Sequence, residues 1–145
     1  MELISQQNQK LIEDRTRFEQ IEKEMLSYPQ VDIPVRHYFG PGVYVREITM
    51  PAGSLVLGAE HKGEQLNNLI SGELDILDEN NQVVRLTGPF TYLAKPGRKM
   101  AYVVKTAVWQ TIIATDETDI EKIEDSIVIK SNTWKELKGE KKWPS

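Results

Sequence analysis

The chain has 145 residues, a formal net charge of −4 and no cysteine. This length predicts one domain with its own core. An acidic balance without a basic stripe argues against nucleic-acid binding, and the lack of cysteine excludes disulfides and thiolate metal sites.

Residues 3–27 are predicted to form an amphipathic helix, which the Xaa-Pro pairs at 28–29 and 33–34 would end. Its apolar residues recur every seven positions, with further apolar residues that widen the stripe: Ile4, Leu11, Phe18 and Met25, then Leu3, Ile12, Ile21 and Leu26. We expect this stripe to dock on the barrel of its own or a neighbouring subunit. A short coiled coil is the alternative.

Residues 31–114 follow a period of two, interrupted by turn residues such as those at 51–53, 78–81 and 95–98. The predicted strands are residues 43–50, 55–57, 66–77, 83–86, 90–94, 101–105 and 108–114. Many short strands at this spacing predict a mainly β sandwich or barrel.

The remaining segment, 115–145, has N-cap candidates at 115–119 before a predicted short helix at 120–124 and a last strand at 126–129. Residues 116–125 carry a charge of about −5, and residues 130–145, which include Trp134 and Trp143, carry about +3. Opposite charges favour contact between these segments or between subunits, and two solvated faces are the alternative. We therefore divide the chain into an N-terminal helix (1–30), a barrel (31–114) and an acidic helix, final strand and lysine-rich tail (115–145).

The stretch AEHKGEQLNNLISGELDI, residues 59–76, resembles the first motif of the cupin family. That motif has two histidines, then a glutamate, then a glycine. When Gly72 is aligned with the glycine, Gln65 stands at the glutamate, His61 at the second histidine and Ala59 at the first. The resemblance covers about residues 42–114 and implies a cupin-like β-barrel, or jelly roll.

The second cupin motif has a Pro-Gly turn followed by a histidine. Pro96-Gly97 supplies the turn, but Met100 or Ala101 stands where the histidine belongs. A first-row metal needs at least three protein ligands, whereas only His61 remains of the family's four. We therefore predict no metal and no cofactor, with His61 as a weak metal candidate at most.

Four stretches, PVRHYFGPGVYVREITMPAG, HKGEQLNNLISGEL, KPGRKM and TDETDIEKIED, resemble small cupin-like proteins of tailed bacteriophages. This similarity covers about residues 34–125 and implies a phage origin. The first ten residues lack the features of a signal peptide, and no apolar run approaches the roughly 18 residues of a membrane span. We expect the protein in the host cytoplasm or incorporated in the virion, without a membrane partner.

His61, Gln65 and Asn67 alternate onto one strand face, which the barrel match turns inward. With Met100 and Tyr102 they form the candidate ligand pocket. It binds a small polar ligand, such as a sugar, nucleotide or carboxylate, or it is a hydrogen-bonded core cluster. A His61–Tyr102 acid–base pair, as in cupin-shaped epimerases, lacks a second histidine–aspartate partner.

The turn at 95–98 offers the candidate anion contacts Lys95, Arg98 and Lys99, although exposed lysines in turns are usually only solvated. We expect His37 to be a packing or surface residue and the turn at 40–42 to be no phosphate loop. No nucleophile elbow or recognisable carboxylate pair is present in the sequence.

Three functional hypotheses follow. The favoured one is a non-enzymatic, metal-free phage protein that acts as a homo-oligomer in a structural or interaction role, with other phage proteins as further partners. The second is a barrel that sequesters a small polar host metabolite or nucleotide. The third is a cupin-type isomerase, epimerase or metal-dependent oxygenase, which fold analogy alone supports.

Overall fold

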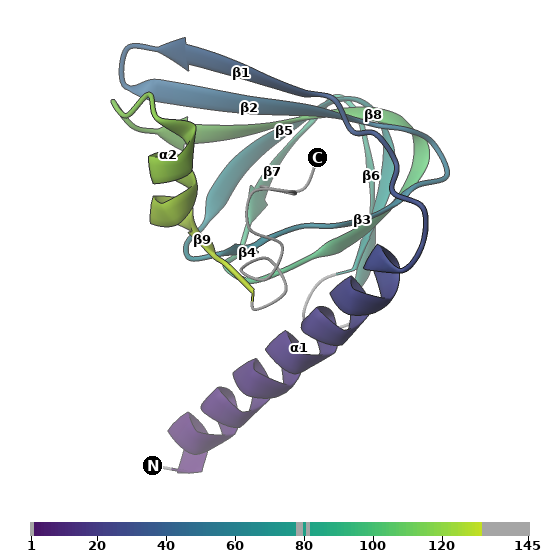
Figure 1. The fold of residues 1–145 in the computed structure, drawn as a ribbon, viewed down its shortest axis with the longest axis vertical. Coiled ribbons are helices and arrows are strands. Elements are labelled where there is room, and N and C mark those ends of the chain that lie inside the picture. Colours follow the sequence, from purple (N-terminus) through teal and green to yellow (C-terminus); the bar gives the residue numbers. More distant parts are fainter. Residues whose placement is uncertain (1, 78–79, 81, 132–145) are drawn as a thin grey trace.

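The computed structural model describes residues 2–77, 80 and 82–131, with side chains at Gln9, Glu13 and from Arg15 onward. A helix at each end of the described chain flanks a curled β-sheet (Figure 1). The elements in chain order are α1 (Glu2–Leu26), β1 (Val35–Gly40), β2 (Val43–Met50), β3 (Leu55–Leu57), β4 (Glu60–His61), β5 (Gln65–Leu77), β6 (Val83–Thr87), β7 (Phe90–Ala94), β8 (Met100–Ala114), α2 (Ile120–Ile127) and β9 (Val128–Ile129).

The main sheet has seven strands in the order β1-β2-β8-β5-β6, with β3 also paired to β8 and β7 to β5. Its two longest strands, β5 and β8, pair with each other. Their pairing runs from Leu66 opposite Ile112 to Leu77 opposite Met100. The register between them shifts at several points between Leu69 and Leu74. Such irregularities bend paired strands, which lets the sheet curl around a core. β4 and β9 form a separate two-stranded sheet.

The strand predictions hold for most of the barrel. β2 and β7 have the predicted bounds, β3 begins at the predicted residue, and β5 and β6 differ by one residue at one end. The prediction of two strands at 101–105 and 108–114 is wrong, because both ranges belong to the single bent strand β8. The two-residue strand β4 and the edge strand β1, which has almost no buried residue to reveal a period of two, were not predicted. Most of the predicted turn at 78–81 lies outside the described residues.

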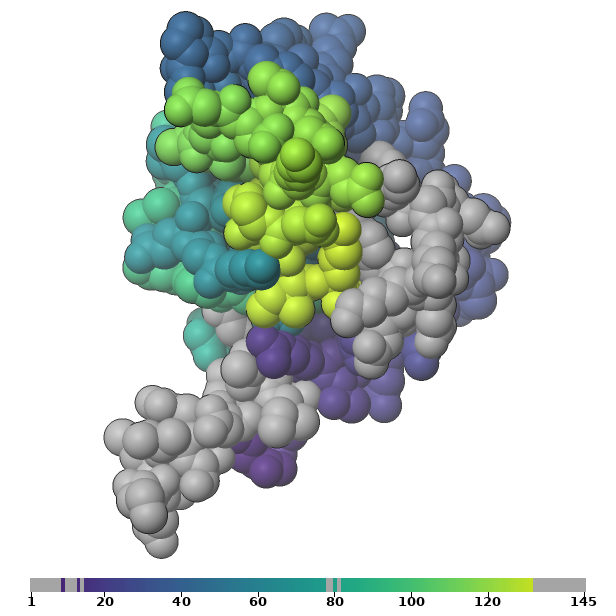
Figure 2. Space-filling model, turned by 60° about the vertical axis from the view of Figure 1, so that its left-hand side comes forward, coloured from purple at the N-terminus to yellow at the C-terminus, as the bar shows by residue number. Residues whose placement is uncertain are grey.

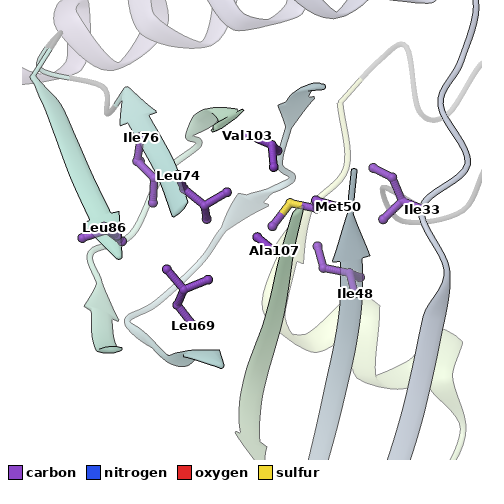
Figure 3. Packing of buried hydrophobic residues seen from close by; sticks show 9 residues of the cluster. All are labelled: Ile33, Ile48, Met50, Leu69, Leu74, Ile76, Leu86, Val103 and Ala107. Carbon is purple, nitrogen blue, oxygen red and sulfur yellow. The ribbon is translucent and has the colours of Figure 1, made fainter. Parts of the chain in front are cut away.

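The core of the barrel is a cluster of buried apolar side chains (Figure 3). These side chains point toward one another from the strands around the barrel and from the segment before β1: Ile33, Ile48, Met50, Leu69, Leu74, Ile76, Leu86, Val103 and Ala107. The strict alternation of buried and partly exposed residues along β2 confirms its predicted period of two.

Helix α2 covers a second, smaller core. Ile123 is 1% exposed and packs with Tyr44 and Ile113 from the inner face of the sheet. The Asp119 carboxylate caps the helix by accepting from the Glu121 amide at 3.0 Å, which confirms the predicted N-cap region. The helix is longer than predicted, so the final strand keeps only two residues.

Helix α1 docks on the barrel by its C-terminal half, and its N-terminal end projects away from the barrel (Figure 1). Phe18 of the apolar stripe is 2% exposed. On the same helical face, Arg15 binds Glu60 of β4 at 2.8 Å and Glu22 binds Arg98 at 2.5 Å. These contacts confirm docking on the barrel of the same chain for this half of the helix.

Candidate functional site

Asn67 is the centre of a hydrogen-bond network inside the barrel. Its Oδ1 accepts from Thr111 Oγ1 at 2.9 Å and from Trp109 Nε1 at 3.2 Å. Its Nδ2 donates to the carbonyl oxygens of Gln65 at 3.0 Å and Tyr92 at 3.4 Å. The amide therefore has partners for both of its polar atoms, which supports the core-cluster interpretation for this residue.

Gln65 and His61 differ from Asn67, because each has a buried side-chain atom without a hydrogen-bond partner. These atoms are Oε1 of Gln65 and Nδ1 of His61. Gln65 is 7% exposed and points inward, two residues before Asn67 on β5. His61 lies on the separate strand β4, where its backbone pairs with Gly97 through bonds of 3.0 and 3.1 Å. An unpaired buried polar atom is costly, so these two atoms are the polar groups that a small ligand would satisfy.

The electrostatics of the interior are set by Arg46, a buried residue that the sequence analysis missed. It is 5% exposed and is the cross-strand neighbour of Thr111. Burial lowers the pKa of Arg46 to about 10, while Tyr44 and the buried Glu124 act in the opposite direction. The period of two in VYVREITM already places this arginine on the inward face, which is the signal that could have found it.

His61 is held in its neutral form by these surroundings. Burial, together with the positive charges of Lys99 and Arg46, lowers its pKa to about 4. At neutral pH the interior therefore combines a neutral imidazole with a buried guanidinium.

His37 pairs with Tyr44 of the neighbouring strand β2. Its Nδ1 and the Tyr44 hydroxyl oxygen are 2.7 Å apart and share a hydrogen bond, and the two rings stack. Burial raises the pKa of Tyr44 to about 12, so its hydroxyl stays protonated. This contact supports the packing role expected for His37.

Met100 and Tyr102 do not join the interior cluster, so their placement in the pocket is wrong. They alternate along β8 with Ala101 and Val103, which pack in the core. Tyr102 is 48% exposed. Because successive residues of a strand point to opposite faces, the position that replaces the motif histidine on the inner face is Ala101. The structure therefore does not form a His61–Tyr102 pair.

The candidate anion contacts at the turn already have partners. Arg98 binds the Glu22 carboxylate at 2.5 Å and the Gly58 carbonyl at 2.6 Å, so it anchors α1. Lys95 lies 3.6 Å from Glu64. Lys99 donates to the Lys95 carbonyl at 2.8 Å. The charge of Arg98 is thus neutralised within the chain, and its prediction as an anion contact is wrong.

The interior residues do not fit a divalent metal. Within the described part of the chain, no group of three His, Cys, Asp or Glu side chains could hold such an ion. The one histidine of the motif has cations as its charged neighbours, and these would repel a metal.

A second feature, which was not predicted from the sequence, lies on the outer face of the sheet. We call it the outer apolar row. Its members are cross-strand neighbours, one each from β1, β2, β8, β5 and β7: Tyr38, Val45, Ile112, Leu66 and Leu93. Tyr38, Leu66 and Leu93 are 46%, 43% and 52% exposed, and the other two are partly buried.

The acidic segment 116–125 meets lysines where the structure describes both. Lys130 binds Asp125 at 2.7 Å, and Lys62 donates to the Asp125 carbonyl at 2.8 Å. Figure 2 shows this region in green to yellow, between the blue strands and purple helix α1. The Lys130 contact is local, between residues five positions apart, so contact of the lysine-rich tail with the body or with another subunit stays a prediction. Residues 132–145, with Trp134 and Trp143, lie outside the described residues.

None of the described helices has both the length and the apolar character that crossing a membrane requires.

Comparison with known proteins identifies the fold. No family model and no curated protein matches the sequence. Ectoine synthase from P. lautus has a TM-score of 0.54 at 12% identity, covering 72% of this chain and 83% of that one. A conserved protein with a double-stranded β-helix domain from Klebsiella pneumoniae has a TM-score of 0.50 at 18% identity, covering 60% and 81%. KdgF from Halomonas sp. has a TM-score of 0.50 at 12% identity, covering 63% and 90%.

At such low identity these likenesses show the fold alone. The chain has a mainly β, cupin-like fold with an N-terminal helix and a short C-terminal helix, as the sequence resemblance implied.

Proposed function

We propose that this chain is a non-enzymatic, metal-independent phage protein that works as a homo-oligomer in a structural or interaction role. It acts in the host cytoplasm or on the virion, where other phage proteins are its further partners. The phage origin and location rest on the sequence resemblance.

The outer apolar row is the observation that carries this proposal. Single exposed apolar residues are normal on a protein surface, but contiguous apolar surface is typical of interaction sites. Here the apolar side chains continue across neighbouring strands of one sheet face, without a charged residue among them.

The polar residues inside the barrel argue against a catalytic role. A general base works best when its pKa lies near the operating pH, whereas burial holds the pKa of His61 at about 4. Tyr102, the proposed acid–base partner, lies on the outer face. The polar groups of Asn67 are engaged in the network that it centres.

The native mass of the purified protein tests the proposal. We expect a multiple of 16.6 kDa by light scattering, even at low concentration, with no stoichiometric metal by elemental analysis of the same sample. Apolar surface that is buried between subunits drives this association. A monomer would contradict the homo-oligomer, and one bound metal per chain would contradict metal independence.

A second candidate function, capture of a small polar ligand in the barrel, is favoured by the unpaired atoms of Gln65 and His61. A ligand with hydroxyl donors would satisfy Gln65 Oε1, and a carboxylate would be attracted by the positive charge of Arg46. Sugar acids combine both groups.

Ligand-dependent melting tests this second candidate. If the barrel binds sugar acids, they raise the melting temperature of the wild-type protein, because a ligand that binds only the folded state stabilises it. Gln65→Leu should lose this response, whereas Gln9→Leu, on exposed helix α1, should keep it. An equal response in both variants would show that binding occurs elsewhere.

A further inference from the structure

We propose that the outer apolar row is the contact between two copies of this chain, which stack face to face about a two-fold axis. The axis passes through Ile112 and runs along the strands. This inference rests on the homo-oligomer of the proposed function and adds the surface and the symmetry.

The face has the size of a small interface. Neighbouring strands lie about 4.8 Å apart, so the row extends about 19 Å across the sheet. β2 has 8 residues, and at about 3.4 Å per residue it is about 27 Å long. β1 and β7 are shorter, with 6 and 5 residues, so the face measures at most roughly 500 Å², compared with the roughly 600 Å² per partner at the lower end of specific interfaces.

The row is complementary to itself when the order of its strands is reversed. The proposed axis places Tyr38 on Leu93 of the second copy and Val45 on Leu66 of the second copy. Ile112, the middle residue, then meets its own counterpart. Each contact joins two apolar side chains, and both subunits use the same surface, as an isologous dimer requires.

The polar row beside it fits the same symmetry. Its members are cross-strand neighbours, again one from each strand: Arg36, Glu47, Gln110, Asn68 and Thr91. The axis places Glu47 opposite Asn68 and Arg36 opposite Thr91, so no charge meets a like charge.

Hydrogen bonds within this polar row lower the free energy that is needed to remove it from water when a second copy binds. Gln110 donates to Glu47 at 2.8 Å, and Thr91 donates to Asn68 at 3.0 Å. These groups keep partners when water leaves. An uncharged apolar centre with a charge-compatible rim therefore fits a second copy better than a strongly charged partner.

A pair of matched variants tests the surface. Leu66→Gln introduces an amide into the row, whereas Leu55→Gln does the same at a residue of β3 that is 48% exposed and lies outside it. By sedimentation equilibrium we expect Leu66→Gln to raise the dimer dissociation constant by about tenfold or more and Leu55→Gln to leave it unchanged. Far-UV circular dichroism checks that both variants fold.

The outcomes separate this inference from the proposed function. A monomeric wild type would overturn both, and the row would then serve another partner. An oligomer that Leu66→Gln and Leu55→Gln leave equally stable would overturn the inference alone.

The symmetry has a separate test, because the chain contains no cysteine. Ile112→Cys places a single thiol on the proposed axis, opposite its own counterpart. A short bis-maleimide should join two Ile112→Cys chains and leave Leu55→Cys chains separate. Equal cross-linking of both variants would overturn the proposed axis.

Discussion

Gly72→Ala is expected to destabilise the barrel by about 3 kcal/mol or more, as measured by urea unfolding. Gly72 has a φ of +97°, where side chains are strained. An added Cβ would lie 2.4 Å from the Thr106 carbonyl oxygen and 2.5 Å from Ala107 Cα. Both are backbone atoms of β8, the strand that pairs with β5, so the overlap forces the two longest strands apart.

Two other glycines distinguish the cost of backbone strain at a positive φ from the cost of steric overlap of the added Cβ. Gly53 also has a positive φ, +84°, but a Cβ there meets nothing within 4 Å, so Gly53→Ala should cost only about 1–2 kcal/mol. Gly63 has neither a positive φ nor a neighbour within 4 Å, so Gly63→Ala should be close to neutral. If Gly72→Ala cost no more than Gly53→Ala, close packing of β5 on β8 would not be the reason for glycine at this position.

Gly72 also explains why the family motif located part of the fold correctly. The motif glycine stands where β5 bends against β8, which is a requirement of the backbone and not of metal chemistry. Residues at fixed distances from this bend, Gln65 and Asn67, were therefore placed inward correctly. The fold could be predicted from the motif even though its ligands are absent.

Positions before and beyond that strand were predicted less well. The sequence pattern puts His61 on the same strand as Gln65, but it lies on β4, because the chain bends at residues 62–63 between the two strands. At the second motif, counting from the Pro-Gly turn does not decide whether Met100 or Ala101 stands at the position of the motif histidine. Neighbouring residues face opposite sides of a strand, so only the structure distinguishes Ala101 inside from Met100 outside.

Features that depend on contacts between distant segments could not be predicted at all. The outer apolar row joins single residues of five strands, and its continuity depends on the register between them. Each residue alone, such as Leu93, is an ordinary exposed apolar side chain. The engagement of Arg98 by Glu22 likewise depends on where α1 docks, 76 residues away in the sequence.

The free energy of unfolding is expected to fall by up to about 3 kcal/mol as the pH decreases from about 6.5 to about 4, because the unfolded chain protonates His61 in this range. The folded protein lowers the pKa of this side chain from 6.5 to about 4. Within this window the unfolded chain therefore binds a proton at His61 that the folded protein excludes. Acidification thus favours unfolding until the folded pKa is passed, and above about pH 6.5 this dependence disappears.

The measurement is the free energy of unfolding from urea titrations across this pH range, for the wild type and for His61→Asn. Carboxylates titrate in the same range in both proteins, so the difference between the two curves isolates the imidazole. His37→Asn is the matched control. Burial and Arg46 lower the pKa of His37 as well, but its exposed ring lets water weaken the effect.

We expect the wild-type curve to fall more steeply than that of His61→Asn and nearly in parallel with that of His37→Asn. Parallel curves for the wild type and His61→Asn would mean that the pKa of the imidazole stays near its ordinary value of about 6.5 in the folded protein. An interior acid would then be available in the barrel at neutral or mildly acidic pH, and the case against catalysis would lose its main support. The same titration thus decides between a structural and a chemical role for the one histidine that the family motif retains.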